Sequence, residues 1–235
     1  MVPAVFAQEP PEREISVDHK GNPQKVTYAL YLPADYKPQK DKLYPVIVCV
    51  GGLPSGPREC YEDNWNKFAD ENGFAILGVG FTFIQEDWGA QESYQFPQAW
   101  SGGAVLKILD ILKDEYPIDP KELYFLGISA GAQFGVRFSA FRPEMTKAVA
   151  AHAPGGYDLP VAYTPAKILI TVGEKDNDPI TRVEWAQAYY NSAKEAKVDV
   201  RLEIIPGIAH RQTEPQNEMS RQFFKEVVEN TRIND

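Results

Sequence analysis

The chain has 235 residues, of which 43 % are hydrophobic and 24 % are charged. This is the composition of a globular protein with a substantial core, and it excludes a disordered chain, a collagen-like repeat and a small disulfide-dense scaffold. The formal net charge of −9 argues against a basic nucleic-acid-binding surface and against a polybasic membrane patch. No apolar run reaches the roughly eighteen residues of a membrane-spanning helix. We therefore expect no nucleic-acid partner and no membrane span.

The first residues carry a trace of a targeting sequence. Val5-Phe6-Ala7 before Gln8 is typical of the small-residue end of a signal peptide, although the basic and long apolar regions that should come before it are missing. We interpret residues 1–12 as a flexible N-terminus with a signal-peptide remnant, which favours a secreted or periplasmic protein. An ordinary flexible terminus on a cytoplasmic protein is the alternative.

Strand-like and helix-like patterns alternate from about residue 25 to the end. Strands are predicted at residues 26–32, 45–50, 74–79, 123–126, 148–153, 167–172 and 198–205. Helices are predicted at residues 61–71, from 100 or 101 up to Pro117, after residues 127–131 up to Phe141, at 181–196 and at 215–231. Short strands separated by helices predict βαβ units and a mostly parallel sheet. Because no linker or repeat divides the chain, we expect one α/β domain over residues 13–235.

Two cysteines are too few for a disulfide framework, and no Cys/His cluster or HExxH motif suggests a metal. We expect Cys49 to be a small buried hydrophobic residue and Cys60 to be a loop thiol. A bridge between them is the less favoured alternative. No metal and no cofactor are expected.

Residues 127–131 (GISAG) form the strongest local motif, because they follow a predicted strand and precede a predicted helix. In that context a G-x-S-x-G sequence makes a sharp turn that exposes the serine at the edge of the sheet, at the positive end of the helix. Ser129 is therefore the candidate nucleophile. The alternative is a tight turn in which the serine only caps the helix.

A nucleophilic serine needs a base, and the chain has three histidines. His19 lies in a polar N-terminal stretch and is expected at the surface. His210 follows the last strand, in a loop at the edge where parallel α/β sheets place their sites, and is the candidate base. His152 ends another strand at that edge, so a pocket-lining or structural role is expected for it rather than a role as the base.

The acid that orients the base should follow the strand at residues 167–172. Asp176 is the preferred candidate, Asp178 the competitor and Glu174 a distant third, while Asp178 next to Pro179 is alternatively a helix cap. The chain order serine, acid, histidine is the order expected when the nucleophile lies in a strand-to-helix turn of a parallel sheet, and it differs from the order in other serine hydrolases.

Negative charge develops on the carbonyl oxygen of the substrate when a serine attacks it, so backbone N–H groups should face that oxygen. One donor is expected at Ala130, directly after the nucleophile. The other is expected in the turn after the strand at 45–50, at Gly52 first and Leu53 next. The alternative is a Gly-Gly turn that serves backbone geometry alone, and it is compatible with the functional role.

Together these residues resemble the α/β-hydrolase superfamily, and within it small single-domain esterases similar to feruloyl esterases and polyhydroxybutyrate depolymerases. The resemblance covers about residues 25–230 and rests on Tyr28–Pro33, Gly51-Gly52, residues 127–131, Gly173 with Asp176, and Gly207 with His210. It implies the α/β-hydrolase fold and an acyl-enzyme mechanism. Val50 stands where the family often has a histidine. The short segment at residues 154–166 implies an open site without a helical cap domain.

The segment at residues 81–100 is rich in aromatic residues and is expected to hang over the cleft, with Trp88 and Trp100 contacting substrate together with His152. The alternative is a loop that packs a small core of its own. We expect hydrolysis of short-chain or aromatic esters, including carbohydrate-linked ones. A serine peptidase of the same fold and a non-catalytic hydrolase-fold binding protein are the rival interpretations.

Overall fold

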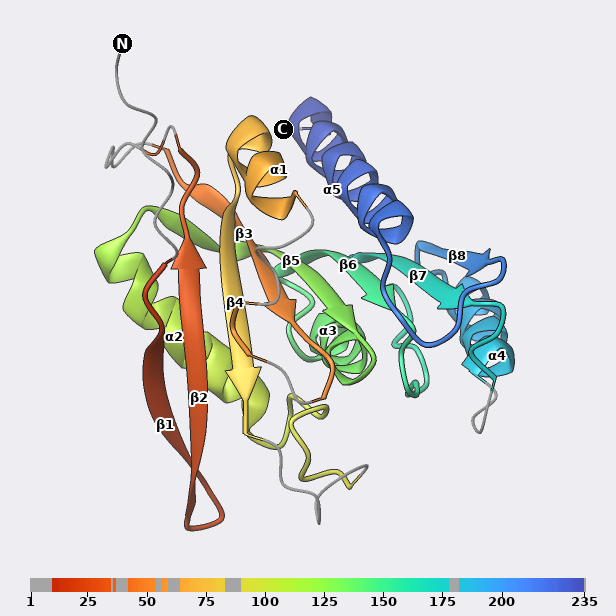
Figure 1. Ribbon diagram of the computed structural model, residues 1–235, viewed down its shortest axis with the longest axis horizontal. Coiled ribbons are helices and arrows are strands. Elements are labelled where there is room, and N and C mark those ends of the chain that lie inside the picture. Colours follow the sequence, from red (N-terminus) through yellow and green to blue (C-terminus); the bar gives the residue numbers. More distant parts are fainter. Residues whose placement is uncertain are drawn as a thin grey trace.

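The computed structural model describes residues 10–34, 36, 42–53, 56–58, 64–82, 90–177 and 182–234. Over these residues the chain forms an eight-stranded sheet with helices on both faces (Figure 1). The strands are β1 (Arg13–His19), β2 (Asn22–Tyr31), β3 (Tyr44–Val50), β4 (Ala75–Phe81), β5 (Ile118–Ile128), β6 (Thr146–His152), β7 (Lys167–Gly173) and β8 (Val200–Ile205). The helices are α1 (Trp65–Asn72), α2 (Ser101–Glu115), α3 (Ala130–Phe141), α4 (Arg182–Glu195) and α5 (Glu214–Asn234).

The strand order across the sheet is β1-β2-β4-β3-β5-β6-β7-β8. β2 runs antiparallel to both β1 and β4, whereas every neighbouring pair from β4 to β8 is parallel. The predicted α/β architecture with a mostly parallel sheet is therefore confirmed. Because the parallel strands point the same way, the segments that follow β3, β5, β6, β7 and β8 all leave from one edge of the sheet.

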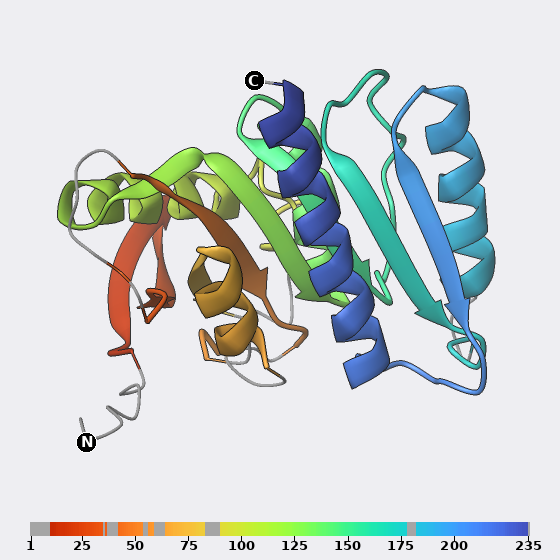
Figure 2. The same cartoon turned by 90° about the horizontal axis from the view of Figure 1, so that it is seen from above.

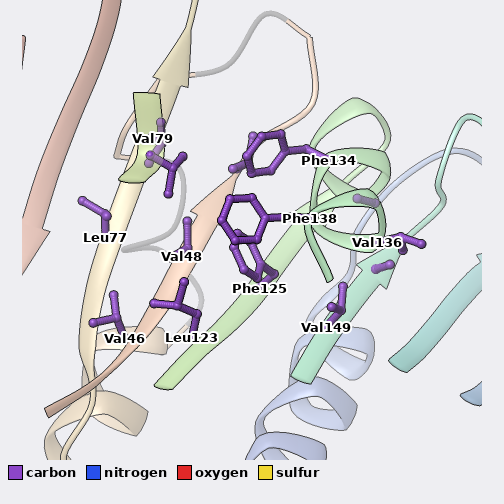
Figure 3. Close-up of a cluster of buried hydrophobic side chains, with 14 of the residues drawn as sticks. Val46, Val48, Leu77, Val79, Leu123, Phe125, Phe134, Val136, Phe138 and Val149 are labelled. Atoms are coloured by element: carbon purple, nitrogen blue, oxygen red, sulfur yellow. The ribbon is translucent and has the colours of Figure 1, made fainter. Parts of the chain in front are cut away.

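The five described helices divide between the two faces of the sheet. α2, α3 and α4 contribute to one hydrophobic cluster, and α1 and α5 contribute to the other (Figure 2). In the first cluster the rings of Phe134 and Phe138 on α3 point toward Phe125 of β5 and the valines of β3 (Figure 3). The central strands are buried on both faces, which is why they read as continuous apolar runs in the sequence. None of the helices among the described residues has the length and hydropathy needed to span a bilayer.

A strand that the sequence did not indicate opens the sheet. β1 pairs with β2 from Arg13 opposite Tyr28 to His19 opposite Asn22, around a turn in which Lys20 and Gly21 both have positive φ. Its residues alternate between half-buried and exposed, so as an edge strand it carries little of the core and only a weak apolar pattern.

The N-terminus predicted to be flexible is only partly within the described residues. Pro10 is buried, so residue 10 is packed rather than free. The signal-like segment at residues 5–8 lies outside the described residues.

Cys49 is disulfide-bonded, which corrects the expectation of an unpaired thiol. Its side chain belongs to the same cluster as Trp65, the first residue of α1. The chain therefore returns to the face of Cys49 soon after position 60, which the spacing in sequence alone did not reveal. Cys60 itself and the predicted start of the helix at residue 61 lie outside the described residues. α1 ends as predicted at Asn72, where Gly73 has φ 70°.

Candidate active site

Ser129 lies between β5 and α3 in a sharp, strained turn. Its φ of 55° and ψ of −113° are unfavourable for a residue with a side chain. The flanking glycines are required by close backbone contacts, since a Cβ on Gly131 would lie 1.9 Å from the carbonyl oxygen of Val50, and one on Gly127 would lie 2.5 Å from the carbonyl carbon of Gly131. Ser129 precedes α3 but makes no side-chain capping hydrogen bond. The hydroxyl is therefore not used as a helix cap, and it faces the cavity described below.

His210 and Asp176 meet at the same edge of the sheet. His210 Nδ1 lies 2.8 Å from Asp176 Oδ2, and the histidine side chain is 36 % exposed while the aspartate side chain is 1 % exposed. Backbone hydrogen bonds join the two loops, from Lys175 N to Ile208 O at 2.8 Å and from Glu174 N to Ile205 O at 2.9 Å. Among the described residues neither Ser129 Oγ nor His210 Nε2 has a hydrogen-bond partner.

The choice among the three acidic candidates rests on contacts. Asp176 bonds His210, whereas Glu174 Oε2 accepts a hydrogen bond from Gly207 N at 2.9 Å. Asp178 lies outside the described residues. The first turn of α4 is capped by Asn177, whose Oδ1 accepts a hydrogen bond from Val183 N at 3.1 Å. Asp176 has a second partner, because Arg182 Nη1 donates to its Oδ1 at 2.8 Å.

The predicted oxyanion donors lie beside Ser129. Ala130 is the first residue of α3, so its N–H has no acceptor within the helix. A Cβ placed on Gly52 would lie 3.7 Å from the Cβ of Ser129, which puts the turn after β3 in contact with the elbow. The carbonyl oxygen of Gly52 accepts a hydrogen bond from Tyr94 Oη at 3.4 Å, and Leu53 packs against the adjoining core.

Among the described residues that line the cavity beside Ser129, His152 is absent, which corrects the expectation that it contacts substrate. It is completely buried, with Nδ1 2.7 Å from Thr171 Oγ1 and Nε2 3.0 Å from Ser220 Oγ. Side chains alternate along a strand, and His152 shares the face of Ala148 and Ala150, which is covered by α5. The cavity beside Ser129 is on the opposite face.

The hydrogen bonds of the two neighbouring hydroxyls indicate which ring nitrogen of neutral His152 carries the proton. Gln216 Nε2 donates to Thr171 Oγ1 at 2.8 Å, and Ser220 Oγ donates to Gln216 O at 3.1 Å. All four groups are satisfied when Thr171 donates to Nδ1 and the proton on Nε2 is donated to Ser220. Burial lowers the pKa of His152 to about 3, so the imidazole is uncharged at neutral pH.

The aromatic segment divides between core and cavity. Phe81 stacks on Tyr94 and packs edge-on against Trp100, with ring centroids 5.0 and 5.7 Å apart. Trp100 is buried, donates from Nε1 to Glu92 O at 2.8 Å and does not contribute to the cavity, so its expected contact with substrate is wrong. Phe96 does line the cavity. Trp88 lies outside the described residues.

A cavity of about 620 Å³ opens onto Ser129 between α3, α4 and the segment from Gly155 to Pro160. Its aromatic lining residues are Phe96, Tyr157, Trp185 and Tyr189. Tyr157 and Tyr189 stack with centroids 4.7 Å apart, and burial raises the pKa of both phenols, to about 12 for Tyr189, so both keep their protons at neutral pH. Among the described residues no three His, Cys, Asp or Glu side chains gather into a metal site.

No family model matches the sequence, and no curated protein matches it. Solved structures do resemble it. A poly(3-hydroxybutyrate) depolymerase from Bordetella parapertussis has a TM-score of 0.67 and 22 % identity over 92 % of this chain and 89 % of that one. A ferulic acid esterase from Anaeromyces mucronatus has a TM-score of 0.66 and 17 % identity over 92 % and 90 % of the chains. An S-formylglutathione hydrolase from Staphylococcus aureus has a TM-score of 0.63 and 14 % identity over 92 % and 99 %. This chain has the α/β-hydrolase fold.

In this α/β-hydrolase fold the connection between β6 and β7 is a short segment that forms one wall of the cavity, rather than a cap domain. Arg137 on α3 holds that wall, because its Nε and Nη2 donate to the two carboxylate oxygens of Asp158 at 2.9 and 3.0 Å. Gln133 and Arg137 lie four and eight residues after Ser129 on the cavity side of α3, a spacing that could have identified them from the sequence. Arg182 matches no sequence motif and was missed, although it is the first residue of α4 and lies six residues after Asp176.

Proposed function

We propose that the protein is a serine carboxylic-ester hydrolase with Ser129 as nucleophile, His210 as base and Asp176 as the orienting acid. The observation that carries the proposal is the hydrogen bond of 2.8 Å between His210 Nδ1 and Asp176 Oδ2, at the sheet edge where Ser129 is held in its strained turn. The resemblance to solved esterases supports an ester as the substrate.

The reaction proceeds through an acyl-enzyme in two halves. His210 Nε2 takes the proton of Ser129 as Oγ bonds to the ester carbonyl carbon, and the oxyanion is held by the N–H of Ala130 and that of Gly52 or Leu53. The C–O bond to the alcohol then breaks, and the alcohol leaves with the proton from His210. In the second half His210 deprotonates water, which attacks the acyl group, and Ser129 regains its proton as the acid departs. Asp176 stabilises the imidazolium in both halves.

The cavity supports short-chain or aromatic acyl esters, including carbohydrate-linked ones. The segment at residues 154–166 forms one wall of the cavity and leaves Ser129 partly exposed, so a bulky alcohol can extend into solvent. Phe96, Tyr157 and Tyr189 supply flat apolar surface for an aryl ring.

An exported location belongs to the same proposal. The disulfide at Cys49 supports it, since disulfides persist in oxidising compartments and are rare in the cytosol of most organisms. The signal-like residues Val5-Phe6-Ala7 point the same way. Fractionation of the native host with an antibody to the protein tests the location.

The activity is tested with p-nitrophenyl esters of increasing acyl length and with methyl ferulate. We expect turnover by the unmodified protein, a fall of about 10⁴-fold or more in kcat for Ser129→Ala, and a fall of similar order for Asp176→Asn. Ser139→Ala is the matched control, because Ser139 is buried on α3, the helix that follows Ser129, and within the described residues its hydroxyl bonds Val136 O alone. Circular dichroism verifies that each variant is folded.

The rival functions give different results in the same assay. Activity on peptide substrates with none on esters would favour the peptidase interpretation, for which a putative dipeptidyl aminopeptidase from Bacteroides ovatus is a structural precedent at 15 % identity and a TM-score of 0.65. A folded protein with no hydrolytic activity, and no labelling of Ser129 by a fluorophosphonate, would favour a binding protein.

A further inference from the structure

Three polar atoms in the wall of the cavity beside Ser129 are buried without a hydrogen-bond partner among the described residues. They are Gln95 Nε2, Tyr157 Oη and Arg182 Nε. They come from three separate parts of the chain, namely the segment before α2, the β6–β7 connection and the start of α4. Buried polar groups are nearly always paired, so three unpaired donors in one cavity indicate a place for a ligand with acceptor atoms.

Arg182 has an unused edge of the right shape for a carboxylate. Its Nη1 donates to Asp176 Oδ1, and no other hydrogen bond of its guanidinium is found within the described part of the chain. The N–H groups of Nε and Nη2 therefore remain available. These two groups are parallel donors, and they match the two oxygens of a carboxylate.

Arg137 shows how the Nε and Nη2 edge of an arginine binds a carboxylate in this cavity. Its Nε and Nη2 hold both oxygens of Asp158 at 2.9 and 3.0 Å in the wall of the same cavity. Its Nη1 is also used, by Gln95 O and Gln133 Oε1. Of the two arginines that line the cavity among the described residues, Arg182 is the one with unused donors.

The neighbouring groups add donors of the same kind. Burial raises the pKa of Tyr157, so its hydroxyl keeps its proton and can donate to an anion. The amide of Gln95, which is 2 % exposed, can present its N–H₂ group from the other side. Apart from Asp158, which Arg137 neutralises, no carboxylate lines the cavity among the described residues.

We propose that this cavity binds a carboxylate of the substrate, on the Nε and Nη2 edge of Arg182 and with Tyr157 and Gln95 as further donors. The substrate is then an ester that carries a free carboxylate away from the reacting bond, such as the monoester of a dicarboxylic acid or an ester of a hydroxy acid. The inference rests on the proposed esterase function. None of the three unpaired atoms is exposed in this structure, so the wall has to move outward slightly for an acceptor to reach them.

Two matched substrate series test the inference on the unmodified protein. The acyl series compares p-nitrophenyl monoesters of glutarate and adipate with p-nitrophenyl pentanoate and hexanoate. The alcohol series compares the acetate ester of 4-hydroxybutanoate with that of its methyl ester. We expect kcat/KM to favour the carboxylate by about 10- to 100-fold in one series. No preference in either series, with neutral esters hydrolysed, overturns the carboxylate site alone, whereas no hydrolysis of any ester overturns the proposed function.

Variants then assign the preference to the unpaired donors. Arg182→Lys keeps a cation beside Asp176 but loses the planar edge, so the carboxylate preference should fall about tenfold or more. Tyr157→Phe removes one hydroxyl and should lower the preference by a smaller factor. The ratio of the two rates is the readout because a general fault in catalysis lowers both rates together. Arg201→Lys and Tyr163→Phe, which lie outside the cavity, should leave the ratio unchanged. An unchanged ratio in both Arg182→Lys and Tyr157→Phe contradicts the assignment.

Discussion

His210 and His152 both lie at the carboxyl edge of the parallel strands, but their surroundings suit them to different roles. The side chain of His210 is 36 % exposed, and its Nδ1 lies 2.8 Å from a buried carboxylate. His152 is completely buried between the hydroxyls of Thr171 and Ser220. A carboxylate stabilises an imidazolium, whereas two hydroxyls in a dry core do not offset the cost of burying the charge.

The difference shows that position along the sheet edge does not by itself assign a histidine. The role of each histidine depends on which face of the sheet its side chain points to and on whether a carboxylate lies beside it there. His210 has a ring nitrogen open to the site and Asp176 behind it. His152 fastens α5 to β6 and β7 through a closed set of hydrogen bonds that includes Gln216. Substitution of each histidine tests this contrast.

Replacing His210 should give the largest effect. For His210→Gln we expect kcat on a p-nitrophenyl ester to fall by about 10⁴-fold or more, because Ser129 loses its base. The melting temperature should change little, since the side chain is partly exposed and Asp176 keeps its ion pair with Arg182. Steady-state kinetics measure kcat, and a thermal melt measures the melting temperature. A variant with nearly full activity would remove His210 from the mechanism.

Replacing His152 should affect stability instead of catalysis. His152→Ala leaves a cavity and removes one hydrogen bond from each of the two buried hydroxyls, which among the described residues keep only their bonds to Gln216, so we expect the free energy of unfolding to fall by about 3 kcal/mol. Activity of the folded fraction should stay within about threefold of the unmodified protein. Ser220→Ala, which removes one partner, should cost only about 1 kcal/mol. Urea denaturation together with ester kinetics separates the two effects, and a loss of kcat without a loss of stability would mean that His152 takes part in catalysis.

The sequence carried enough information for the parallel part of the sheet and for the elbow. β3, β5, β6 and β7 are buried on both faces, so their apolar runs are strong, and the glycines at 127 and 131 are demanded by backbone contacts that a Cβ would block. The edge strand β1 was not predicted because a half-exposed strand has little apolar pattern to detect.

What could not be predicted depends on contacts between distant segments. The alternation of Ala148 and Ala150 with His152 was visible, but which face α5 covers was not. Arg182 matches no motif, and although it lies only six residues after Asp176, the sequence did not show that its side chain turns back to that carboxylate. The disulfide of Cys49 is a similar case, because it depends on the chain returning to the face of the sheet where Cys49 lies.

The pH dependence of stability is the smallest expected effect that distinguishes the two histidines. The pKa of His152 is about 3 in the folded protein, against 6.5 for a histidine in an unfolded chain, so the unfolded state binds the proton first as the pH falls. The stabilising effect is complete above pH 6.5 and is lost progressively toward pH 3. Between pH 7 and pH 5 this loss amounts to roughly 2 kcal/mol.

The His152→Ala variant isolates this loss from every other titrating group, including His210 and His19, which both proteins share. Urea denaturation of the two proteins at pH 7 and pH 5 should therefore show a steeper fall for the unmodified protein, and the two stabilities should converge as the pH is lowered. Parallel falls would mean that His152 accepts a proton in the folded state as readily as in the unfolded chain. In that case the two hydroxyls, Thr171 and Ser220, would be accommodating a charge, and the contrast with His210 would rest on the carboxylate alone.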